Sequence, residues 1–199
     1  MDEYSISRQY ETTLDLLKDN ISRSFSKSVK TGCFDKAKRI KNSLTGDVYV
    51  VFTKEGGMTL FANIDGYWVF SSVMAVVQLG REVKNYNILT HHFIDRYRCR
   101  LNMYATPIAD VLYDIHLNFN DSTTIHNDRF PEGALYMRKS DVVVPCVASY
   151  THTKRYEYHV TILKTVLDFK DTKTDAVRNR AEEVKVTANG IDNNLSSTN

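Results

Sequence analysis

The residues best suited to chemistry lie between Thr90 and Arg100, in the sequence Thr-His-His-Phe-Ile-Asp-Arg-Tyr-Arg-Cys-Arg. Helical spacing would place His92, Arg96 and Arg100 along one face, because residues four apart on a helix are neighbours. Thr90 precedes the helix and has a side chain that can cap its first turn. An imidazole and two guanidiniums on one face suit an anion. The sequence therefore predicts phosphate binding by Thr90, Arg96 and Arg100.

The same face could also cleave RNA without a metal. His92 would act as general base or acid, because its ordinary pKa lies near the working pH, and the two arginines would stabilise the charge of the transition state. Tyr97 and Tyr104 could stack bases. Two other interpretations remain open. The arginines could be neutralised by the chain's own Asp95 or Asp110, and a histidine on a helix is more often a hydrogen-bonded structural residue than a catalyst.

A second group with chemical potential is the sequence Tyr158-His159-Val160-Thr161-Ile162. On a strand, alternation would place His159, Thr161 and Thr165 on one face. This H-x-T pattern resembles one half of the two-histidine phosphoesterases, in which two such motifs surround a phosphodiester, often a cyclic one. No second H-x-T/S occurs in the chain, and one imidazole cannot serve as both acid and base. A further alternative is therefore a phosphodiesterase with His159 and Thr161 as catalytic residues. The competing interpretation is that His159 is a partly buried structural residue of a strand.

Other cofactor chemistry has no motif to support it. Adjacent His91 and His92 would point to different faces of a helix, and no H-x-x-x-H occurs, so no metal site is predicted. Neither G-x-x-x-x-G-K-S/T nor G-x-G-x-x-G is present, which predicts no nucleotide cofactor. The three cysteines, at 33, 99 and 146, are far apart and are expected to be reduced thiols.

The composition is that of an ordinary globular chain, with 199 residues, 42% hydrophobic side chains, 25% charged side chains and a net charge of +2. No apolar run approaches the roughly 18 to 20 residues that cross a bilayer, and the first residues lack the pattern of a secretory signal. We therefore expect no membrane segment and a cytoplasmic location. Basic residues concentrate between Lys18 and Lys41, where they predict either a positive surface or an ordinary solvated helix face.

Residues 1–45 predict an amphipathic helical hairpin. Apolar residues recur at intervals of three and four from Ile6 to Val29, and the pattern resumes from Phe34 to Leu44 after Gly32. Such an apolar stripe needs a partner. The partner would be either the core of the same chain or a second copy, so the N-terminal helix is a candidate for self-association.

Residues 46–170 predict an α+β core domain, an antiparallel sheet with helices packed on one side. Helices are expected over 90–101 and from 107 onward, separated from the later strands by a polar loop over 119–131. Strands are expected over 47–53, 58–63, 67–77, 133–137, 141–149 and 156–169. Residues 171–199 are charged and poor in aromatics, which predicts a short helix and a disordered tail.

The T-x-H-x-x-x-R-x-x-x-R pattern formed by Thr90, His92, Arg96 and Arg100, followed by a helix from Pro107 and a run of strands, resembles small proteins of bacterial mobile elements, among them the BrnT-like toxins. The resemblance spans residues 88–167. It implies a compact ribonuclease-toxin fold related to RelE that cleaves RNA without a metal, and it carries over those four residues as the site. The expected function is thus RNA or nucleotide phosphate binding by a phage- or plasmid-type protein in a bacterial cytoplasm. The alternative is a non-enzymatic assembly protein of a phage or mobile element.

Overall fold

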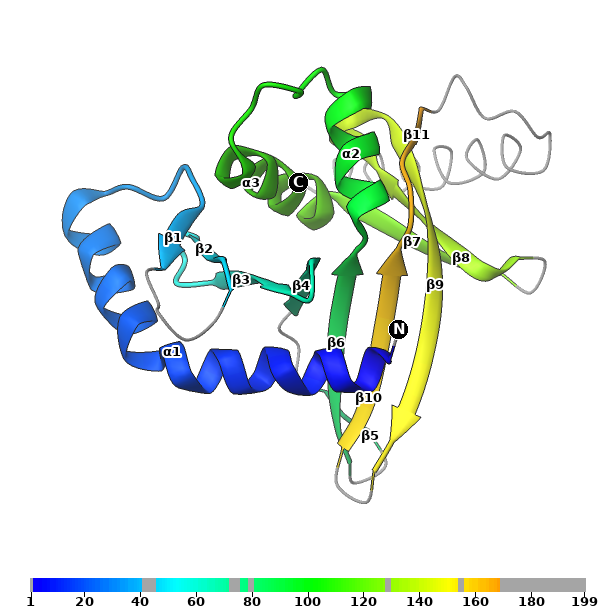
Figure 1. Cartoon of the computed structure of the whole chain (residues 1–199), viewed down its shortest axis with the longest axis horizontal. Helices are drawn as coiled ribbons and strands as arrows, with labels where there is room; N and C mark the ends of the chain where they lie inside the picture. Colours follow the sequence, from blue (N-terminus) through cyan, green and yellow to red (C-terminus); the bar gives the residue numbers. More distant parts are fainter. Residues whose placement is uncertain are drawn as a thin grey trace, which may run out of the picture.

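The computed structural model describes residues 2–40, 46–71, 76–78, 81–127, 130–153 and 156–168. It confirms the α+β class (Figure 1). The predicted tail over 171–199 lies outside these residues. The elements in chain order are α1 (Glu3–Thr31), β1 (Lys38–Ile40), β2 (Val48–Phe52), β3 (Met58–Ile64), β4 (Tyr67–Ser71), β5 (Val76–Gln78), β6 (Arg81–Leu89), α2 (His91–Arg100), α3 (Ile108–Asn120), β7 (Ser122–Asn127), β8 (Phe130–Met137), a 3-10 turn η1 (Arg138–Ser140), β9 (Val142–His152), β10 (Tyr156–Leu163) and β11 (Leu167–Asp168).

The strands form one mostly antiparallel sheet in the order β1-β2-β3-β4-β6-β10-β9-β8-β7, with β5 paired to β6 and β11 paired to β9 outside this path. The exception is the central pair, because β6 and β10 run parallel. A parallel pair needs a long crossover connection, and here that crossover contains α2, α3 and β7 to β9. This topology brings the two groups of chemistry-bearing residues, on α2 and on β10, into one domain.

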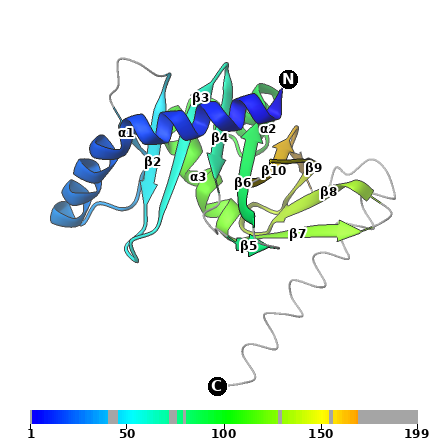
Figure 2. The ribbon, with the colours of Figure 1, turned by 90° about the horizontal axis from the view of Figure 1, so that it is seen from below.

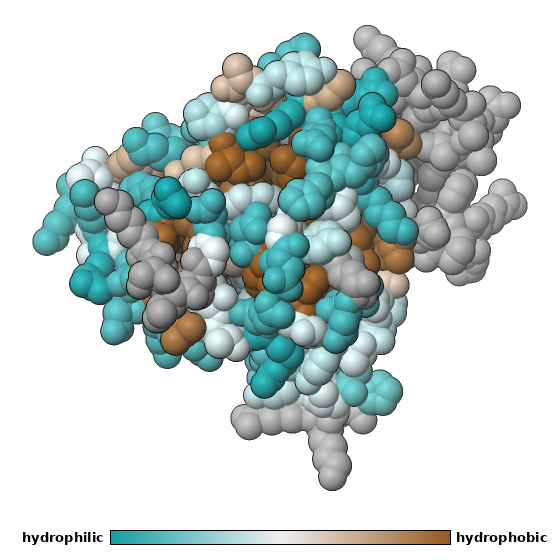
Figure 3. Space-filling view, viewed as in Figure 1, coloured by the Kyte–Doolittle hydropathy of each residue, from teal (hydrophilic) through white to brown (hydrophobic). Residues whose placement is uncertain are grey.

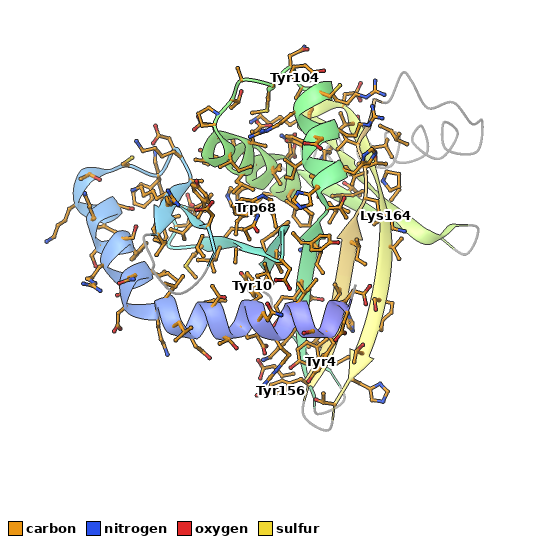
Figure 4. All side chains as sticks on the ribbon, in the orientation of Figure 1. Tyr4, Tyr10, Trp68, Tyr104, Tyr156 and Lys164 are labelled. Carbon is orange, nitrogen blue, oxygen red and sulfur yellow. The ribbon has the colours of Figure 1, made fainter. Side chains whose placement is uncertain are left out.

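Helix α1 lies across one side of the sheet (Figure 1 and Figure 2). Its apolar stripe is buried against the strands, through Ile6, Tyr10, Leu17 and Ile21. The Tyr10 hydroxyl, seen between α1 and the strands in Figure 4, donates to the Leu60 carbonyl at 2.9 Å. These four residues therefore find their partner inside the chain, whereas Val29 at the end of the predicted stripe is 56% exposed.

The prediction of a second helix after Gly32, which would complete a hairpin, is wrong. Gly32 ends α1 in a left-handed conformation with φ 65°, as expected, but Lys38–Ile40 then forms β1 and pairs with β2. The remaining residues of that prediction, 41–45, lie outside the described part of the chain. A short amphipathic pattern cannot sustain a helix alone, and the strand instead buries Ile40 in the core beneath α1.

The opposite face of the sheet carries α2 and α3, which lie together on one side as predicted. Alternation along the strands separates the two cores, so that Val50 packs beneath α1 whereas Val51 packs against the other helices. Phe93 of α2 and Ile115 of α3 are fully buried in this second core. The two helices are thus held by the sheet, and the outer side of α2 is left to solvent.

Two further differences concern strands. The region predicted as a polar loop over 119–131 contains β7, whose residues pair with β8, and β6 was not predicted at all. Among the described residues, no helix is long and apolar enough to cross a membrane. The face that carries α1 is mostly hydrophilic, with hydrophobic patches that are separated from one another (Figure 3).

Candidate functional site

The helix that carries the predicted motif begins where expected. The Thr90 side chain accepts a hydrogen bond from the Phe93 amide at 3.1 Å, which is a helix N-cap. The same hydroxyl lies 3.1 Å from the carbonyl oxygen of Lys164, to which it donates. This hydroxyl both accepts and donates a hydrogen bond within the chain. Thr90 therefore fixes the start of α2 to the end of β10 and is a positioning residue.

The other motif residues share one side of α2, as the spacing predicts. His92 and Arg96 are exposed and Arg100 is partly buried; we call these three residues the basic strip. Asp95 is the one acid within α2, against three arginines and two histidines. Arg98 faces away from the strip, and its guanidinium donates to the Thr106 carbonyl at 3.2 Å. The strip therefore presents basic side chains on the outer side of α2, exposed at His92 and Arg96 and partly buried at Arg100.

An aromatic side chain stands at the end of the basic strip. Tyr104 is 66% exposed and lies beside the C-terminal end of α2, whereas Lys164 lies at its N-terminal end (Figure 4). The Tyr104 hydroxyl donates to the Cys99 sulfur at 2.8 Å. This hydrogen bond raises the pKa of Tyr104, and the nearby positive charges of Arg100 and Arg96 act in the opposite direction. Tyr104 thus lies within electrostatic range of both arginines and presents its ring to solvent.

The predicted stacking role of Tyr97 is wrong, because this side chain is fully buried. Its hydroxyl donates to the Asp114 carboxylate at 2.8 Å and accepts from the Asn118 amide at 2.8 Å. The Ser140 hydroxyl donates to the Asn118 side-chain oxygen. Burial, together with the charge of Asp114, raises the pKa of Tyr97. The phenol stays neutral, and this network joins α2, α3 and η1 beneath the basic strip.

His159 lies on β10, where alternation puts it on the sheet face opposite α1 with Thr161, as predicted. Its Nε2 lies 2.7 Å from a carboxylate oxygen of Glu157. The ring of Tyr150, on the paired strand β9, meets the imidazole edge to face with ring centres 4.9 Å apart. About a third of each of the two paired side chains is exposed, at 29% for His159 and 30% for Glu157. Sequence reasoning found His159 and missed Glu157, although a carboxylate two residues away on a strand was a readable signal.

A third polar cluster joins α1 to the sheet. One carboxylate oxygen of Glu11 accepts from the Lys84 ammonium at 2.5 Å and from the Tyr86 hydroxyl at 2.7 Å. Lys84 also lies 3.9 Å from the centre of the Tyr156 ring. These residues are more than 70 positions apart in the chain, so no local pattern could have grouped them. The cluster is a satisfied ion pair that fastens the helix, and we assign it no chemistry.

The thiols and candidate metal ligands add no further site. In the ranges that the structure describes, no three His, Cys, Asp or Glu side chains are grouped closely enough to hold a metal ion. Cys146 is buried, and burial raises the pKa of its thiol to about 12. A thiol with so high a pKa is a poor nucleophile at neutral pH.

The structure brings each predicted group together but keeps the two groups apart. The Thr90 amide donates to the Leu163 carbonyl at 3.2 Å, so α2 starts at the end of β10. His159 lies four residues earlier on that strand, which is about 13 Å of extended chain, and α2 continues beyond the end of β6 in the opposite direction (Figure 1). The basic strip and His159 therefore belong to separate surfaces. Comparisons of the chain with protein-family models, with curated proteins and with solved structures found no match.

Proposed function

We propose that this protein binds single-stranded RNA through the basic strip of α2 and the exposed ring of Tyr104. The observation that carries the proposal is the juxtaposition of an exposed guanidinium, that of Arg96, with an exposed aromatic ring. Binding of single strands combines these two features, because cations follow the phosphate backbone while bases stack on aromatic side chains. The proposal extends the phosphate-binding role expected from the motif to a particular class of ligand.

The charge around α2 supports an anionic ligand. His92, Arg96 and Arg100 project from one side of the helix, and Lys164 adds an exposed cation near its first turn. Guanidiniums bind phosphate oxygens in pairs through parallel hydrogen bonds. The distance between residues four apart on a helix, about 6 Å, is close to the spacing of successive phosphates in a single strand. A phosphate backbone could thus contact Arg96 and Arg100 together.

Tyr104 favours a polynucleotide over free phosphate. Free phosphate makes no stacking contact with the Tyr104 ring, which is 66% exposed. An unstacked base covers such a ring, and this stacking contributes about 1 to 3 kcal/mol of binding free energy. The hydrogen bond to Cys99 holds the phenol in place without covering its face. Because the Tyr97 network holds α2 in place, binding costs little conformational entropy in this helix.

The proposal is for binding, not for cleavage at α2. A general base is usually oriented by a second group that fixes its tautomer. His92 is exposed on the outer surface of the helix, and no hydrogen bond holds its imidazole in the described part of the chain. We therefore assign His92 no acid–base role on α2.

The test is fluorescence anisotropy with a labelled single-stranded RNA of about 12 nucleotides, on the wild type and three variants. Arg96→Ala should raise Kd about tenfold, because a hydrogen bond to a charged group contributes about 1.5 kcal/mol or more. Tyr104→Ala should raise Kd about fivefold or more through lost stacking, and Tyr104→Phe should bind like the wild type.

The matched control is Arg23→Ala, which removes one exposed guanidinium from α1 on the other side of the sheet. It should leave Kd nearly unchanged. Equal weakening by Arg96→Ala and Arg23→Ala would mean that only net charge matters, and the assignment to α2 would then be wrong.

A further inference from the structure

The sheet face opposite α1 changes character along β6, β9 and β10. Near Thr90 it is apolar and covered, since Leu89, Cys146 and Leu163 pack in the core with α2 and α3. Further from α2, the same face carries polar side chains. Register and alternation place them side by side on the three strands, with the apolar Val83 and Ala148 among them: Asn85, Asn87, Tyr150, His152, Glu157, His159 and Thr161. A sheet face usually buries apolar side chains, so this run of amides, imidazoles and a carboxylate is the local exception to the pattern.

His159 is the oriented member of this group. Its Nε2 is held 2.7 Å from Glu157, and the Tyr150 ring packs against the imidazole. When Nε2–H donates to the carboxylate, Nδ1 carries a lone pair and the ring is fixed as a proton acceptor. The same carboxylate stabilises the imidazolium that forms when Nδ1 takes a proton. This is the arrangement of a general base.

A second imidazole lies across the ladder. His152 of β9 pairs with Glu157, and Tyr150 pairs with His159, so both histidines are on one face and diagonal to each other. Diagonal neighbours on antiparallel strands have Cα atoms about 7 to 8 Å apart, within reach of long and aromatic side chains. His152 is exposed, and an imidazole can give a proton to a leaving oxygen. The sequence pattern did not identify His152 as a partner of His159, because His152 belongs to no H-x-T/S motif.

We propose that His159 and His152 form a metal-independent acid–base site that cleaves phosphodiesters of single-stranded RNA. His159 takes the proton from a ribose 2′-hydroxyl, whose oxygen attacks the adjacent phosphorus. The bond from phosphorus to the 5′ oxygen breaks, and His152 gives its proton to that leaving oxygen. The products are a 2′,3′-cyclic phosphate and a 5′-hydroxyl. Atoms and charge balance without a metal or an oxidant, and the proton gained by His159 replaces the one lost by His152 through solvent.

This inference takes only its ligand class, single-stranded RNA, from the proposed function, and it uses none of the residues of the basic strip. Neighbouring groups suit that ligand. The Tyr150 ring is 62% exposed and can stack a base. Thr161 and Asn85 offer a hydroxyl and an amide beside His159 on the same face, which can hydrogen-bond ribose and base edges.

The test incubates the full chain with a labelled single-stranded RNA of mixed sequence in excess chelator and separates the products by length and by end group. The wild type should yield 2′,3′-cyclic phosphate ends, and RNA with 2′-deoxyribose at the cleaved position should be resistant. His159→Gln and His152→Gln should each lower the cleavage rate about 100-fold or more, the usual contribution of a general acid or base. His152 is exposed, so its replacement keeps the fold intact even if His159→Gln does not. The control His91→Gln, which changes a histidine of α2, should cleave like the wild type.

The outcomes separate the two proposals. RNA that binds with the predicted loss in Arg96→Ala but is never cleaved would overturn the acid–base site alone. A second outcome is cleavage that depends on both histidines, together with a Kd for RNA that is unchanged in Arg96→Ala and Tyr104→Ala. That outcome would overturn only the proposal of binding at the basic strip and would support the acid–base site. Cleavage of equal rate in the wild type and both histidine variants would also contradict the acid–base site.

Discussion

At the scale of single residues, the environment rather than the residue type decides what each histidine can do. His92 is exposed and unoriented, His159 is held by a carboxylate, and His116 is buried with 6% of its surface exposed. Nε2 of His116 lies 3.1 Å from the Asn120 amide nitrogen. An amide N–H donates to an imidazole only when that nitrogen carries a lone pair, so His116 is a neutral structural residue.

The burial of His116 predicts a pH dependence of stability. Desolvation lowers its pKa in the folded protein, whereas in the unfolded chain the pKa is near 6.5. Between these values the unfolded state binds more protons, so the free energy of unfolding falls as the pH drops below about 6.5. Thermal unfolding followed by circular dichroism should show a larger loss of Tm from pH 7.5 to pH 5 for the wild type than for His116→Gln. An identical pH profile of the two proteins would contradict this assignment.

At the scale of elements, helical periodicity in the sequence predicted the helices well, whereas the strand patterns predicted the strands less completely. The spacing of apolar residues correctly predicted α1, α2 and α3, and Thr90 was correctly identified as a cap. Strand β6 was missed because adjacent polar residues, as at Arg81-Glu82 and Lys84-Asn85, interrupt the alternation that is typical of a half-buried strand. Asn85 and Asn87 of β6 lie on the face that carries His159. Such a face is visible only when the partner strands are known. The suggestion that Tyr97 stacks bases was wrong, because four-residue spacing puts Tyr97 in the same buried stripe of α2 as Phe93.

The Tyr97 network should set how firmly α2 is held. Tyr97→Phe removes a hydroxyl that bonds to both Asp114 and Asn118, and leaving buried partners unsatisfied costs about 1 to 3 kcal/mol. Urea unfolding should show a lower midpoint with an unchanged slope. Because Tyr97 does not belong to the proposed binding surface, the Kd for RNA at low temperature should change less than twofold. A large loss of binding without a loss of stability would place Tyr97 in the binding site.

At the scale of the whole molecule, function is proposed on two surfaces that a single domain keeps apart. The net charge of +2 is too small to attract nucleic acid by itself, so binding depends on the local concentration of cations on α2. Helix α1 buries Ile6, Tyr10, Leu17 and Ile21 against the sheet, whereas Val29 at the end of its predicted stripe is 56% exposed. The assembly alternative stays a prediction. The sequence alone could name the basic motif and His159, but only the sheet register joins His159 to His152.

The most direct test of the central claim is the salt dependence of RNA binding. Each phosphate contact that is lost reduces the slope of log Kd against log salt by about 0.7 for a single strand. Titrations of the wild type and Arg96→Ala with the same labelled RNA, from about 50 to 200 mM salt, should give a lower slope for the variant. Tyr104→Ala should bind more weakly with the slope of the wild type. Parallel slopes for the wild type and Arg96→Ala, or no measurable binding at low salt, would contradict the assignment of RNA binding to α2.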